Sequence, residues 1–117
     1  MIKPHNEPLK GVSILGSTGS IGTNTLKVIE RFDERFRVIG LAAGKRIPNL
    51  KAQINQFRPA LVSVANEEAA LELQSQHPNV RVLTGVEGMV EVATQPESDF
   101  LISATVGAVG LVPTMRG

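Results

Sequence analysis

The chain has 117 residues, about the size of one domain, so we expect a single domain over residues 1–117. Hydrophobic residues make up 42% and charged residues 20%, values near globular averages that exclude a disordered or fibrous chain. The formal net charge is +1 with basic residues scattered among acidic ones, which argues against nucleic acid as a partner, and no apolar run approaches the roughly 20 residues that span a membrane.

Five short segments rich in apolar and β-branched residues predict strands, at residues 11–15, 36–42, 60–64, 80–83 and 100–103. Apolar residues with helical spacing fall between them and predict four helices. The expected core-facing positions are Ile21, Thr25, Val28, Ile29 and Phe32, then Leu50, Ile54 and Phe57, then Ala69, Ala70 and Leu73, then Val86, Met89, Val90 and Ala93. This alternation indicates an α/β fold, a doubly wound Rossmann-like parallel sheet of about five strands with helices on both faces.

The predicted helix ends carry matching signals. Pro48 suits the first turn of the second helix, and Asn66 is a good N-cap for the third because its side chain can accept from free backbone amides. Pro59, Pro78 and Pro96 stand just past three helices, where a residue without an N–H cannot continue the hydrogen-bond ladder.

Three glycines at intervals of three, Gly16, Gly19 and Gly22, lie between the first predicted strand and the first predicted helix. In dinucleotide-binding folds such glycines allow a tight turn, close approach of the pyrophosphate, and close packing of helix on strand. The helix dipole favours an anion there, and Thr18 and Ser20 can add hydroxyl donors. No Gly-Lys-Ser/Thr ending is present, which disfavours an NTPase phosphate loop. A purely structural turn is the alternative interpretation.

The end of the second strand indicates which dinucleotide is bound. In NAD-binding proteins an acidic residue about 20 positions past the glycines accepts from the ribose hydroxyls. Here that region reads Leu-Ala-Ala-Gly-Lys-Arg over residues 41–46, with two cations and no carboxylate. Lys45 and Arg46 favour a 2′-phosphate and therefore NADPH over NADH. The alternative is that both are ordinary solvated loop charges.

Four stretches, at residues 14–23, 36–45, 57–59 and 106–114, together resemble the 1-deoxy-D-xylulose 5-phosphate reductoisomerase family. The first reads ILGSTGSIGT and the last VGAVGLVPT, and the similarity covers nearly the whole chain. The resemblance implies NADPH-dependent rearrangement and reduction of 1-deoxy-D-xylulose 5-phosphate to 2-C-methyl-D-erythritol 4-phosphate, in the non-mevalonate route to isoprenoids. It further implies a divalent metal, Mg or Mn, and a homodimer for the full-length enzyme.

The predicted cofactor-binding residues are Gly16, Thr18, Gly19, Ser20, Ile21, Gly44, Lys45 and Arg46. The resemblance places residues 18–21 at the cofactor phosphates and residues 44–46 around the adenosine ribose phosphate. Arg46 stands where the family often has Asn, which changes the donor geometry and keeps the positive charge. Gly107 and Gly110 are expected in a loop after the fifth strand, either under the nicotinamide or as turn residues.

The family continues into an Asn-Lys-Glu motif, metal-binding carboxylates, a lid and a C-terminal domain, and these do not occur within the 117 residues. His5 and His77 are isolated, Glu67, Glu68 and Glu72 suggest a solvated helix face, and the chain contains no cysteine. We therefore expect no catalytic and no metal-binding residue in this chain, and we expect the piece to be inactive alone. A truncated chain should also expose apolar surface at the far side of the fifth strand and self-associate.

Residues 1–9 lack the apolar core of a secretory signal, so a cytoplasmic location is expected. Two other functions stay open. One is another NADPH oxidoreductase domain, such as a semialdehyde dehydrogenase or dihydrodipicolinate reductase relative, which should lack the stretch at residues 106–114. The other is a non-enzymatic nucleotide-binding module.

Overall fold

The computed structural model describes residues 9–44, 46–103 and 110–113. Along the chain the elements are β1 (Lys10–Leu15), α1 (Ser20–Arg31), β2 (Phe36–Ala42), α2 (Ile47–Phe57), β3 (Leu61–Val64), α3 (Glu67–Gln76), β4 (Arg81–Thr84), α4 (Gly85–Ala93), β5 (Phe100–Ser103) and β6 (Gly110–Pro113). The five predicted strands and four predicted helices are confirmed, with strand ends shifted by at most one residue.

The strands form one sheet in the order β4-β3-β2-β1-β5-β6. The first five are parallel, as predicted, and β6 runs antiparallel to β5. The expected loop at Gly110 is therefore wrong, because this residue begins β6. Gly107 lies outside the described residues. The far side of β5, where the sequence suggested exposed apolar surface, is hydrogen-bonded to β6, and self-association of the chain stays a prediction.

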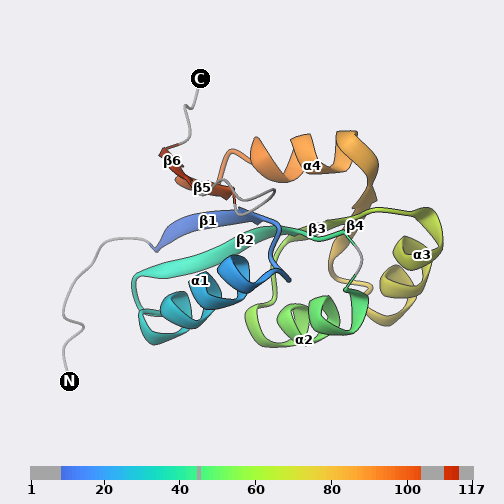
Figure 1. Ribbon diagram of the computed structural model, residues 1–117, viewed down its shortest axis with the longest axis horizontal. Coiled ribbons are helices and arrows are strands. Elements are labelled where there is room, and N and C mark those ends of the chain that lie inside the picture. Colours follow the sequence, from blue (N-terminus) through green and yellow to red (C-terminus); the bar gives the residue numbers. More distant parts are fainter. Residues whose placement is uncertain (1–8, 45, 104–109, 114–117) are drawn as a thin grey trace.

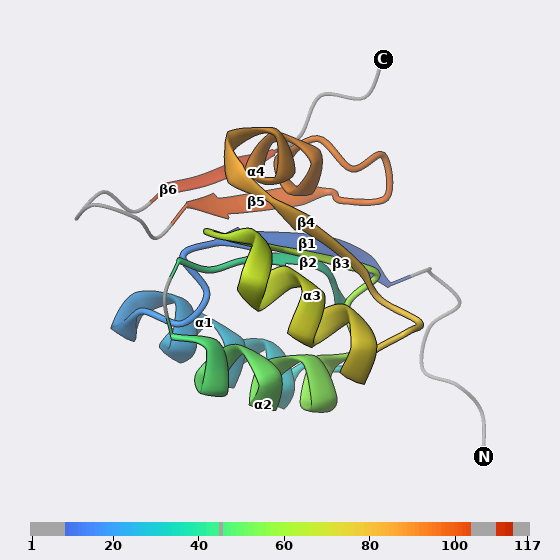
Figure 2. The ribbon, with the colours of Figure 1, turned by 90° about the vertical axis from the view of Figure 1, so that its right-hand side faces the viewer.

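Helices cover both faces of the sheet, as predicted. Figures 1 and 2 show α1, α2 and α3 on one face and α4 on the other. Right-handed crossovers explain this arrangement, because the chain steps in one direction from β1 to β4 and then reverses to reach β5. Two core clusters follow, and Leu41 and Val62 are among the side chains that pack under α1, α2 and α3. Ile39 and Leu61 pack under α4.

The predicted buried faces of α1 and α4 are partly wrong. In α1 the buried residues are Gly22, Leu26 and Ile29, whereas Val28 and Phe32 are exposed. In α4 they are Gly88 and Val92, whereas the predicted Val86, Met89 and Val90 are exposed. The cause is that a glycine stands where the helix comes closest to the sheet. A Cβ at Gly88 would lie 2.3 Å from Ser63 Oγ, so α4 can pack this closely only with a glycine at this position. A search for large apolar side chains misses such a face.

The predicted helix ends are confirmed. Asn66 caps α3, its side chain accepting from the Ala69 amide at 2.8 Å. Pro48 lies in the first turn of α2, and the three prolines expected beyond helices follow α2, α3 and α4.

Candidate functional site

The glycine loop lies at the carboxyl edge of the sheet, beside the point where strand order reverses. Both the Gly16 and Ser17 amides donate to the Ala42 carbonyl, at 2.8 and 3.0 Å, which ties the loop to the end of β2. On its other side β1 pairs with β5, Leu15 opposite Ser103. Ligands of open α/β sheets bind at this switch point. The loop therefore lies at the position where open α/β sheets bind their ligands.

The three glycines of the loop serve different physical needs. Gly16 has φ +81°, which a side chain rarely tolerates. Gly22 allows α1 to lie against the loop, because a Cβ there would be 2.3 Å from the Gly16 carbonyl oxygen. Gly19 differs, since its Cβ would meet only that same oxygen, at an ordinary 3.6 Å. The fold itself therefore leaves room for a side chain at Gly19.

The N-terminus of α1 is suited to an anion. Gly19 is the N-cap and supplies no side-chain hydrogen bond, and the first turn contains no acidic residue. The first amides of a helix have no intrahelical partner and carry the positive end of its dipole. Of the predicted site residues here, Ser20 and Ile21 are exposed, whereas Thr18 is only 6% exposed.

The end of β2 brings the second group of predicted residues to the same edge. Ala43 is buried, and its amide donates to the Ser63 carbonyl at 2.9 Å. Gly44 is exposed, and a Cβ built there would meet nothing within 4 Å. Arg46 is the exposed N-cap of α2. Lys45 lies outside the described residues. The glycine loop and Arg46 therefore lie at the same edge of the sheet, where the loop is hydrogen-bonded to Ala42 at the end of β2.

A cavity of ≈ 360 Å³ opens between these two groups and α4. It is lined by Gly16, Ala42, Ala43, Gly44, Ser63, Val64, Ala65, Gly85, Val86 and Met89. This volume is within the usual range of small-molecule sites, and its mainly apolar wall suits a flat aromatic ring. Residues 63–65 and α4 also line this cavity, and they were not among the residues predicted from the sequence. The contribution of residues 63–65 could have been predicted, because the carboxyl ends of neighbouring parallel strands lie at the same edge of the sheet.

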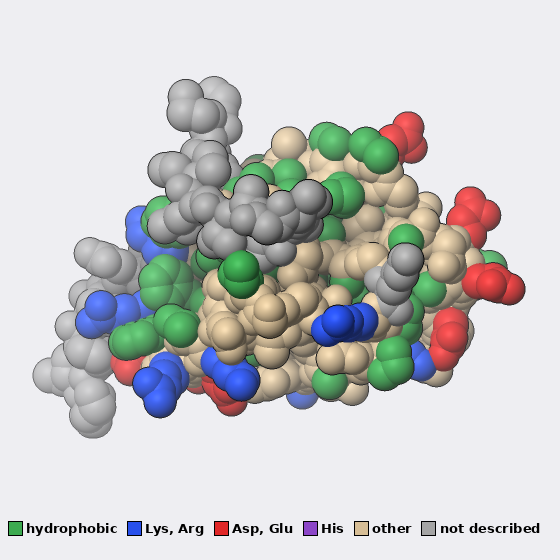
Figure 3. Space-filling model, in the orientation of Figure 1, with side chains coloured by type: hydrophobic (Ala, Val, Ile, Leu, Met, Phe, Trp, Pro, Cys, Tyr) green, Lys and Arg blue, Asp and Glu red, His purple; other side chains and the backbone are tan. Residues whose placement is uncertain are grey.

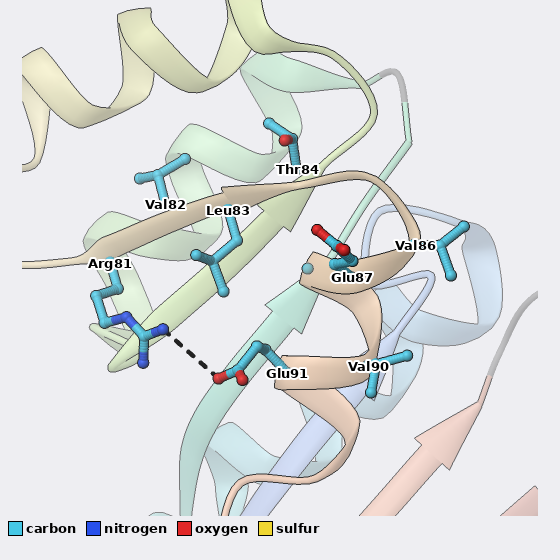
Figure 4. A pocket seen from close by; sticks show the side chains of 9 residues that line it. Arg81, Val82, Leu83, Thr84, Val86, Glu87, Val90 and Glu91 are labelled. Carbon is cyan, nitrogen blue, oxygen red and sulfur yellow. Dashed lines mark ion pairs between the residues drawn. The ribbon is translucent and has the colours of Figure 1, made fainter.

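A second cavity, of ≈ 680 Å³, lies between β4 and α4 (Figure 4). Arg81 forms an ion pair with Glu91 across it at 3.5 Å, and Glu87 is also in its lining. It is larger, but none of the predicted cofactor-binding residues lines it. Two carboxylates against one already paired guanidinium make it unsuited to a phosphate-bearing ligand.

Charged side chains are distributed unevenly over the surface. Figure 3 shows acidic side chains gathered over α3, and lysine and arginine side chains mainly on the side of α1. Glu67, Glu68 and Glu72 are exposed, as expected for a solvated helix face. Among the described residues no group of three or more His, Cys, Asp or Glu side chains is placed to hold a metal ion. Within the same part of the chain no helix is long and apolar enough to cross a membrane.

Comparisons with known proteins agree on one family. The family model for 1-deoxy-D-xylulose 5-phosphate reductoisomerase matches residues 12–117. The reductoisomerase of Bacillus cereus strain Q1 is 44% identical over 108 residues, which are 92% of this chain and 28% of that protein. That of Geotalea daltonii is 46% identical over 108 residues, covering 91% of this chain and 28% of the relative.

Solved structures extend the agreement to the fold. A crystal structure of DOX-P reductoisomerase in complex with NADPH, fosmidomycin and magnesium superposes with a TM-score of 0.79 at 31% identity, over 86% of this chain and 25% of that one. The Zymomonas mobilis reductoisomerase in complex with NADPH gives 0.78 at 28% identity, over 86% and 27%. The chain therefore spans about a quarter of the length of these proteins. It belongs to the 1-deoxy-D-xylulose 5-phosphate reductoisomerase family.

Proposed function

We propose that this chain binds NADPH at the carboxyl edge of its sheet, as the nucleotide-binding part of a reductoisomerase. The pyrophosphate would lie on the amides at the start of α1, over Gly19. The adenosine would occupy the cavity beside Gly16, with its 2′-phosphate near Arg46 and Lys45. The observation that carries the proposal is the spare room at Gly19, next to an uncapped helix N-terminus at the switch point.

When bound, NADPH supplies the hydride for the reduction that the family performs, and the residues of this chain bind and orient it. The full reaction, with its phosphosugar substrate, divalent metal and homodimeric assembly, is proposed for the whole enzyme and rests on family membership. No metal-binding role is assigned to the described residues, which contain no suitable cluster. A cytoplasmic location is part of the same proposal. A non-enzymatic nucleotide-binding module would bind NADPH without activity when the rest of a relative is supplied in trans.

The first test replaces Gly19 with alanine. The added methyl meets protein only at 3.6 Å, so the fold should survive with a small change in melting temperature. The methyl would occupy space assigned to the pyrophosphate, so NADPH affinity, measured by calorimetric titration, should fall about tenfold or more. Unchanged affinity in a folded Gly19→Ala protein would contradict the placement of the pyrophosphate.

The second test concerns the 2′-phosphate. Arg46→Ala should weaken NADPH binding about tenfold, because a charge-assisted hydrogen bond is lost, and should leave NADH binding nearly unchanged. The matched control is Arg37→Ala, which removes an exposed cation from near the opposite end of β2. Equal affinity of the unmodified protein for NADH and NADPH would refute the NADPH preference.

A further inference from the structure

A buried glutamine outside the predicted cofactor site contacts the glycine loop directly. Gln53 lies on α2, is 8% exposed, and donates from Nε2 to the Ser17 carbonyl oxygen at 2.8 Å. The amide of Ser17 donates in turn to the Ala42 carbonyl at 3.0 Å. Ser17 is therefore held on both sides, from β2 by its N–H and from α2 by its carbonyl. The peptide plane that leads into Thr18 and Gly19 has little freedom to rotate.

Stability of the core gives no reason for an amide at this position. Its neighbours Leu50 and Ile54 are fully apolar and buried on the same helix. Gln53 Oε1 and Ser17 Oγ are both buried, and neither has a hydrogen-bond partner among the residues that the structure describes. A buried amide that is only half satisfied is unfavourable compared with a leucine or methionine of similar length, and its side chain also loses rotamer freedom. The hydrogen bond to the loop is the only compensation found for Gln53 among the described residues.

The helix that carries Gln53 also begins at the second phosphate-binding group. Arg46 is the N-cap of α2, and Gln53 stands two turns further along the same helix. One side chain thereby connects the loop proposed to hold the pyrophosphate with the element proposed to hold the 2′-phosphate. The distance between two phosphate groups of one ligand is set by its covalent structure, so a rigid link between their two sites is favourable for affinity.

We propose that Gln53 is a positioning residue for the cofactor: its hydrogen bond to the Ser17 carbonyl fixes the glycine loop relative to α2. This inference rests on the proposed NADPH site. It predicts that loss of the hydrogen-bond donor weakens NADPH binding although Gln53 does not itself touch the nucleotide. It also predicts that the unliganded loop becomes less ordered while the core keeps its stability.

The test uses Gln53→Met, which keeps the length of the side chain and removes the donor. The matched control is Gln56→Met, the same change at an exposed position three residues on. In Gln53→Met, NADPH affinity should fall about tenfold, the size expected for one lost hydrogen bond to the loop. Binding of 2′-AMP, which has no pyrophosphate, should change less than twofold. The melting temperature should change little, because removal of the buried, unpartnered Oε1 offsets loss of the hydrogen bond to the Ser17 carbonyl.

Hydrogen exchange of the Gly19 and Ser20 amides, measured without ligand, gives a second readout and should accelerate in Gln53→Met alone. A folded variant with full NADPH affinity overturns the inference and leaves the proposed function standing. A large fall in melting temperature, with NADPH and 2′-AMP weakened alike, also overturns it, because Gln53 would then be merely structural. If the unsubstituted protein binds no NADPH, the proposed function and the inference fall together.

Discussion

The close approach of α1 to the glycine loop makes Gly22→Ala a sharp test of the fold. In a helix interior, replacing glycine by alanine ordinarily adds about 0.5–1 kcal/mol of stability. Here the new Cβ would lie 2.3 Å from the Gly16 carbonyl oxygen and 2.7 Å from the Ser17 Cα. Both are backbone atoms that cannot rotate away, so α1 has to shift away from the glycine loop. Overpacking of this kind costs about 1–3 kcal/mol, and the clash with backbone places it at the upper end.

The net expectation is that Gly22→Ala lowers the free energy of unfolding by about 2 kcal/mol, the overpacking term minus the gain in helix propensity. For a domain of this size the melting temperature should fall by about 10 °C. Urea unfolding followed by circular dichroism measures the first quantity, and a thermal scan measures the second. Gly44→Ala is the matched control, because its Cβ would meet nothing within 4 Å, and it should be neutral or slightly stabilising. A Gly22→Ala protein as stable as the unsubstituted chain would refute the conclusion that α1 packs on the loop through a contact that only glycine allows.

Three further predictions concern the helices. Leu26→Ala should lower the free energy of unfolding, measured in urea, by about 2–5 kcal/mol because Leu26 is buried. Val28 is 55% exposed, so Val28→Ala should change it by less than about 0.5 kcal/mol. Equal effects of the two substitutions would mean that the buried face of α1 is assigned wrongly. Asn66→Ala should cost about 1 kcal/mol by the same assay through loss of the cap on α3, and no change would argue against the cap. An ion pair joins α2 and α3, with 2.6 Å between Lys51 Nζ and Glu72 Oε2, and both side chains are partly exposed. A double-mutant cycle should therefore give a coupling free energy below about 1 kcal/mol that decreases further in salt. A larger coupling that does not depend on salt would contradict this exposure.

Local sequence was sufficient for the type and order of most elements. Five strands and four helices follow from runs of apolar residues, and the helix ends from Pro48 and Asn66, because each signal acts within one or two turns of chain. The glycine spacing also predicted the turn between β1 and α1, which lies at the carboxyl edge of the sheet. Alternation of strands with helices was enough to predict a parallel sheet covered on both faces.

Other features depend on which surfaces meet in space. The buried faces of α1 and α4 include Gly22 and Gly88 at their closest contacts. The periodicity of large apolar residues does not reveal these positions, because a glycine allows close approach of the helix without adding hydrophobic area. The pairing of β6 with β5 needs a partner edge that only the assembled sheet supplies. The hydrogen bond from Gln53 to Ser17 joins residues 36 positions apart, and the cavity draws on three strand ends and α4. The sequence by itself determined the elements and the chemistry of the loop, whereas contacts between distant segments decided which faces are buried and how the loop is held.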